Sequence, residues 1–131
     1  MGFQLVEHTA DVGLRVWGRS LEELFESAAK GMFSIIGAPE EHGVERSIFL
    51  TADDLETLLV DWLSHLLFLH ETRQETYDRF EVSIKPCWTL RGAALGGPTG
   101  VHGSEVKAVT YHGLKIDREG DLYTATIVFD V

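Results

Sequence analysis

Glu7-His8-Thr9-Ala10-Asp11-Val12-Gly13 and Phe129-Asp130-Val131 are the two stretches of sequence that decide the predicted fold. Each belongs to a segment in which apolar and polar residues alternate, the pattern of a strand with one buried face. The apolar positions are Val12, Leu14 and Val16 in the first segment and Tyr123, Ala125, Ile127 and Phe129 in the second. Asp11 and Asp130 fall on the polar faces. If the two strands are neighbours, both carboxylates and the α-carboxylate of Val131 converge, and charges that close must shift their pKa, attract a cation or move apart.

Asp11, Asp130 and the α-carboxylate of Val131 are therefore candidate ligands of a cation. Carboxylates are hard oxygen donors, which suit Ca²⁺ or Mg²⁺ better than a metal that prefers thiolates. Ca²⁺ usually binds about six to eight oxygens, so backbone carbonyls or water would have to complete the site. The alternative is that Asp130 is an exposed charge near the chain end and that Asp11 caps a local turn.

Three further side chains are candidates for a role beside this site or for contact with a partner: His8, Lys107 and His112. The pKa of a histidine lies near neutrality, so His8 could act as a general base or metal ligand, or it could simply hydrogen-bond the backbone at the strand entrance. A strand is predicted over 105–112. Lys107 and His112 would lie on opposite faces of it and would share a site only if it contained a bulge.

Composition favours a soluble single domain spanning residues 1–131, because 44% of the residues are hydrophobic and 24% are charged. The net charge of −10 weighs against direct binding of nucleic acid, which relies on Lys and Arg.

The longest apolar stretch, 55–69, is interrupted by polar residues and is not expected to span a membrane, and no signal peptide is recognisable. A single cysteine, Cys87, excludes an internal disulfide, fits a cytoplasmic location and is expected to be buried and inert.

Apolar residues at helical spacing predict two main helices. Ser20 and Glu23 form a capping box at the start of the first helix, which ends around 36–39, and the second helix begins after Thr51 or Asp53. Strands are predicted over 3–6, 12–17, 47–51, 80–84, 88–95, 105–112 and 122–129, and the glycine-rich segment 96–103 is predicted to be a mobile loop. These elements predict an α+β two-layer sandwich, with an antiparallel or mixed sheet that has both helices on one face.

Motifs of known enzymes are not found in this sequence. There is no nucleophile elbow, no Cys/His pair in a recognisable context and no two-histidine zinc spacing. The residues alone therefore do not support a complete enzyme active site.

The sequence resembles the archease family in five segments that follow one another in order along nearly the whole chain. These segments are Glu7–Gly13, Ser20–Phe25, Leu58–Leu63, Val106–His112 and Phe129–Val131. The resemblance weakens over 96–104, where family members usually carry a more charged stretch.

The resemblance implies a non-enzymatic protein that activates an RtcB-type, GTP-dependent tRNA-splicing RNA ligase by promoting guanylylation of the ligase and multiple turnover. It also implies a divalent cation site, usually occupied by Ca²⁺ with Mg²⁺ or Mn²⁺ as alternatives, which maps by position onto Asp11, Asp130 and Val131. Two other functions stay open: a metal-dependent phosphoester hydrolase that uses the two aspartates with His8 as base, and a general chaperone or scaffold.

Overall fold

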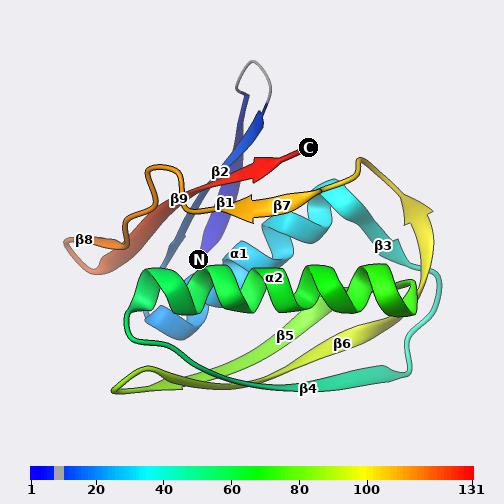
Figure 1. Ribbon diagram of the computed structural model, residues 1–131, viewed down its shortest axis with the longest axis horizontal. Coiled ribbons are helices and arrows are strands. Elements are labelled where there is room, and N and C mark those ends of the chain that lie inside the picture. The colour runs from blue at the N-terminus through cyan, green and yellow to red at the C-terminus, as the bar shows by residue number, and fades with distance from the viewer. Residues whose placement is uncertain (8–10) are drawn as a thin grey trace.

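The computed structural model describes residues 1–7 and 11–131. Within these residues the strands form two antiparallel sheets, and the two helices lie between them (Figure 1). The first sheet contains, in spatial order, β1 (Gly2–Glu7), β2 (Asp11–Gly18), β9 (Leu122–Asp130) and β7 (Ala108–Thr110), and β8 (Asp117–Glu119) also pairs with β9. In the second sheet β6 (Thr89–His102) pairs with β3 (Gly37–Pro39), β4 (Val44–Thr51) and β5 (Glu75–Lys85). The helices are α1 (Leu21–Ile36) and α2 (Leu55–Arg73).

The α+β class predicted from the sequence, with antiparallel strands and two main helices, is confirmed. The prediction of two layers, with one sheet and both helices on one of its faces, is wrong, because the strands are divided between two sheets that enclose the helices. The division follows from α1, which contacts β2 of the first sheet and β5 of the second. A helix with apolar residues on two sides needs a layer on each side to cover them. The fully buried residues of α1 are Leu24, Phe25, Ala28, Ala29 and Met32.

The capping residues that begin the helices were partly predicted. Ser20 caps α1 as expected, because its Oγ accepts a hydrogen bond from the Glu23 N–H at 3.1 Å. The prediction of Thr51 or Asp53 as the cap of α2 is wrong, since Asp54 fills this position and its Oδ1 accepts from the Thr57 N–H at 2.7 Å. Gly37 caps the C-terminal end of α1. Its φ of 146° is a backbone conformation that residues with a side chain rarely adopt.

The prediction of a loop over 96–103 is wrong, because β6 continues through the glycines to His102. Gly96 and Gly97 are buried, and they allow other backbone segments to approach the strand. A Cβ atom on Gly96 would collide with the carbonyl oxygen of Thr76, and one on Gly97 with that of Glu41. Backbone hydrogen bonds join these segments to β6, including one from Gly43 N to the Gly96 oxygen at 3.1 Å. Glycine at these positions therefore serves close packing rather than a turn.

Two further expectations are corrected by the structure. The strand predicted over 105–112 is reduced to the three residues of β7, and Val106 before it is buried while Ala108 is exposed. Cys87, expected to be buried, is exposed in the connection between β5 and β6. No helix in the described part of the chain is long and apolar enough to cross a membrane.

We predict that Gly97→Ala lowers the free energy of unfolding by about 2 to 3 kcal/mol, because the added methyl group must displace the backbone at Glu41. Urea denaturation of the purified protein measures this change. Pro98→Ala is the matched control, since Pro98 is an exposed neighbour on the same strand, and it is expected to change stability by less than about 1 kcal/mol. Equal stability of Gly97→Ala and the parent chain would show that the close approach at Gly97 does not constrain the fold.

Candidate functional site

Asp11 and Asp130 lie directly opposite each other across β2 and β9. Directly paired residues of antiparallel strands carry their side chains on the same face of the sheet, at Cβ separations of about 4.5 to 5.5 Å. The adjacent pair Val12 and Phe129 belongs to the opposite face, where Phe129 is fully buried against the core. Both carboxylates therefore lie on the face turned away from the helices, with Asp11 half-buried and Asp130 exposed. This confirms the prediction that the first and last parts of the sequence form neighbouring strands.

β7 brings Lys107 to the same end of the first sheet. Ala108 pairs with Asp130 on the side of β9 away from β2, and the backbone N–H of Lys107 donates to the Asp130 carbonyl oxygen at 2.7 Å. In Figure 1, β7 lies beside β9 and the C-terminus lies just beyond the end of β9. The end of this sheet thus gathers Asp11, Asp130, Val131 and the exposed residue Lys107.

Of the two histidines predicted near the site, the structure describes His112 but not His8. His8 lies outside the described residues. His112 is exposed and lies beyond the far end of β7, where its N–H donates to Thr110 Oγ1 at 3.3 Å. Because β7 runs from a partner of Asp130 towards a partner of Val128, His112 is further along the sheet from the aspartates than Lys107 is. The structure therefore places the backbone of Lys107 beside Asp130 and leaves His112 further away.

The aspartate pair offers only oxygen donors. Among residues 1–7 and 11–131, no group of three or more His, Cys, Asp or Glu residues could hold a metal ion. A cation at this place would be bound by two side-chain carboxylates, and the α-carboxylate of Val131, backbone carbonyls and water would have to supply the other ligands. That donor set fits Ca²⁺ or Mg²⁺, which take carboxylate, carbonyl and water oxygens. It does not fit a metal that prefers thiolate or imidazole ligands.

Without a cation, two carboxylates placed directly opposite each other repel. We predict that Asp130→Asn, in the presence of a chelator, raises the free energy of unfolding by about 0.5 kcal/mol. Urea denaturation with excess chelator measures this change in the free energy of unfolding. Asp53→Asn removes the same charge from an exposed position on another part of the chain and is expected to have a smaller effect. A lower stability of Asp130→Asn would mean that the native carboxylate makes a favourable contact even without metal.

A second group of polar side chains, which the sequence did not reveal, joins β4 to β5. The guanidinium of Arg46 donates two hydrogen bonds to Glu75, from Nε to Oε1 at 2.9 Å and from Nη2 to Oε2 at 2.7 Å. The Tyr77 hydroxyl also donates to Glu75 Oε1, at 2.8 Å, and Glu75 is only 8% exposed. These bonds from Arg46 hold the pKa of Glu75 below its usual range, and burial together with Glu75 raises the pKa of Tyr77. Because the three groups satisfy one another, we assign them a structural role.

We predict that Glu75→Gln lowers the free energy of unfolding by about 2 kcal/mol at pH 7, because it removes the charge that Arg46 binds. The native pKa of Glu75 is lowered, so its stabilisation is complete above the unfolded pKa of about 4.3 and is lost as the pH falls through the native pKa. The difference between the parent chain and the variant should therefore narrow in acid. Urea denaturation from pH 7 to pH 3 measures it, with the exposed Glu71→Gln as control. A difference that stays constant over this range would contradict the proposed role.

The fold and the aspartate pair define a small, acidic α+β protein in which antiparallel sheets enclose the helices and two carboxylates mark one end of a sheet. The chain belongs to the archease family, because residues 3–131 match the archease protein family (MTH1598/TM1083).

Known archeases and solved structures are similar to the chain over almost its whole length. It is 37% identical to the archease of Methanopyrus kandleri, with 100% of both chains covered, and 39% identical to that of Saccharolobus islandicus, with 98% of both covered. The solution structure of Methanobacterium thermoautotrophicum protein 1598 is similar with a TM-score of 0.86 and 36% identity, covering 99% of both chains. A crystal structure from Thermotoga maritima, called an archease and possible chaperone, has a TM-score of 0.74 and 26% identity, covering 98% of this chain and 96% of the other.

Proposed function

We propose that this chain activates an RtcB-type, GTP-dependent tRNA-splicing RNA ligase and catalyses no reaction itself. Its action would be to promote guanylylation of the ligase and so to support multiple turnover. The observation that carries the proposal is the pairing of Asp11 with Asp130 at one end of the first sheet, in a chain that belongs to the archease family. A cytoplasmic location is part of the proposal and rests on the single cysteine of the chain.

The proposed activator binds a divalent cation through Asp11, Asp130 and the α-carboxylate of Val131. Ca²⁺ is the favoured ion, and Mg²⁺ and Mn²⁺ are alternatives, because all three accept oxygen ligands. The cation would neutralise carboxylates that otherwise repel across β2 and β9, and it would fix the end of the first sheet. Lys107 adjoins this end and is the candidate for direct contact with the partner, whereas His112 lies further away.

The charge of the chain supports a protein partner and argues against direct contact with nucleic acid. A net charge of −10 repels phosphate backbones but attracts the basic surface with which a ligase binds RNA. Long-range attraction of this kind accelerates encounter and aligns the partners before they touch. The cation-bound end of the sheet would then dock near the ligase active site and order the groups that take part in guanylylation.

A general chaperone is the second candidate function. It is favoured by the description of the Thermotoga maritima relative as a possible chaperone. Several large apolar side chains are also exposed here, which a chaperone could use to bind unfolded clients. A chaperone of this kind would act on many proteins and would be indifferent to a chelator. The phosphoester hydrolase is not favoured by any observation among the described residues, since its proposed base, His8, lies outside them.

We predict that Asp11→Asn and Asp130→Asn each reduce stimulation of ligase guanylylation at least about tenfold, because each removes a proposed cation ligand. A time course with the purified ligase, GTP and Mn²⁺ or Mg²⁺ measures this stimulation. Asp53→Asn, with the same loss of charge, should stimulate like the parent chain.

Ca²⁺ at about one hundred times its dissociation constant should add about 2.7 kcal/mol to the stability of the parent chain and much less to that of the variants.

Full stimulation by both aspartate variants would refute the cation-dependent mechanism. Failure of the parent chain to stimulate the ligase, together with suppression of aggregation of unrelated denatured proteins, would select the chaperone instead.

A further inference from the structure

β1 is an exposed edge strand with apolar side chains. It lies at the end of the first sheet, paired with β2 on one side only. Phe3, Leu5 and Val6 are 37%, 49% and 39% exposed. The strand, Gly2–Glu7, contains no Lys and no Pro, which are the residues that commonly prevent an edge from pairing with another chain. Its unpaired backbone groups are therefore suited to accept a further strand.

Unlike β1, the edge strand β5 of the second sheet is partly covered by a side chain. The N–H of Ile84 on its free side donates to Glu22 Oε2 of α1 at 3.2 Å, so a helix side chain occupies part of that edge. Among the residues that the structure describes, no side chain makes a hydrogen bond of this kind to the backbone of β1. The chain thus protects one of the two edges that flank α1 and leaves the other accessible.

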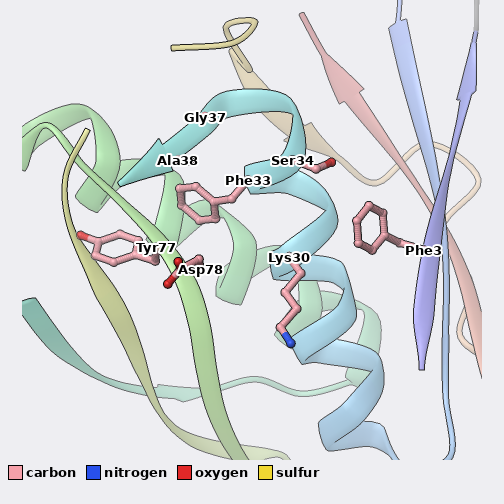
Figure 2. A pocket seen from close by; sticks show the side chains of 8 residues that line it. All are labelled: Phe3, Lys30, Phe33, Ser34, Gly37, Ala38, Tyr77 and Asp78. Carbon is pink, nitrogen blue, oxygen red and sulfur yellow. The ribbon is translucent and has the colours of Figure 1, made fainter. Parts of the chain in front are cut away.

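A pocket of about 240 Å³ lies beside β1, between this strand, α1 and the second sheet. Figure 2 shows Phe3 projecting from β1 towards α1, with Phe33 on the other side of the helix and Lys30 between them. On the side of the second sheet the lining combines an apolar part with Asp78, and in the apolar part Phe33 packs edge to face against the buried Tyr77 with ring centroids 5.5 Å apart. A strand added to β1 could therefore place an apolar side chain in a preformed pocket.

The charges around this pocket identify the kind of partner. α1 carries Glu22, Glu23 and Glu26 along the side that bears Lys30, and β5 contributes Asp78 to the pocket lining. The nearby cations are Lys30 and the N-terminal ammonium group of Met1, whose nitrogen lies 3.9 Å from Glu23 Oε1, so the four carboxylates outnumber them. A second copy of the chain would bring the same carboxylates and another net charge of −10, which disfavours self-association. A segment with net positive charge would be attracted.

We propose that β1 is the docking strand for an extended, basic segment of the ligase, which adds to the edge of the first sheet and inserts an apolar side chain into the pocket beside Phe3. This inference rests on the function proposed above. The register connects the two: Glu7 at the end of β1 pairs with Val12, next to Asp11. A strand docked on β1 would run along the sheet towards the aspartate pair, so binding at the edge would hold the cation-binding end against the partner.

The test compares binding and stimulation in variants of the full chain. Phe3→Ser combined with Leu5→Ser is expected to weaken binding to the purified ligase at least about tenfold, as measured by titration calorimetry. Stimulation should recover at high concentration of this variant, because its aspartates are intact. Phe49→Ser combined with Phe68→Ser is the matched control, since these side chains are 56% and 58% exposed on other surfaces, and it should bind like the parent chain. Asp130→Asn should bind but not stimulate.

If the double variant of β1 does not fold, Leu5→Lys replaces it, because a charge at this half-exposed position opposes pairing with a basic strand. Binding by the β1 variant as tight as by the parent chain would overturn the inference while leaving the proposed function intact. A dimer of the parent chain that the β1 substitutions dissociate, seen by sedimentation equilibrium, would assign the edge to a second copy and would also overturn it. A parent chain that neither binds nor stimulates the ligase would refute the proposed function itself.

Discussion

The pairing of β2 with β9 is the constraint on which the rest of the structure depends. Eight residues of β2 pair in continuous register with eight of β9, from Asp11 with Asp130 to Gly18 with Tyr123. This register places Leu14 and Ile127 opposite each other in the core, both fully buried. A slip of one residue would turn these side chains to solvent and the aspartates towards the helices. Burial of the apolar face thus fixes the position of the carboxylates on the other face.

The sequence predicted those features that depend on local patterns. Alternation along the first and last strands predicted that Asp11 and Asp130 each lie on a polar face, and the spacing of Ser20 and Glu23 predicted the start of α1. Both patterns are set by neighbours a few residues apart, which one sequence is sufficient to reveal. The cation site, in contrast, stays a prediction that rests on the chemistry of the donors.

The features that the sequence did not predict depend on contacts between distant segments. Glycines at Gly96 and Gly97 have the composition of a loop, but they lie in a strand because the backbone at Thr76 and Glu41 passes against them. The ion pair of Arg46 and Glu75 joins β4 to β5, which α2 separates in the sequence and β6 separates in the sheet. The division into two sheets depends in the same way on how α1 is covered, which alternation within single strands does not indicate.

The connectivity of the sheets sets an order for assembly. All strands of the second sheet come from residues 37–102, so this sheet and the helices can form while the ends of the chain are still free. The first sheet needs β9 to enter between β2 and β7, and the loop that this pairing closes contains most of the chain. Closing so long a loop is slow, because its entropy is lost before the contacts that compensate for it are made. During synthesis, the two aspartates can meet only after β9 has left the ribosome, so the carboxylate pair forms later than the second sheet can.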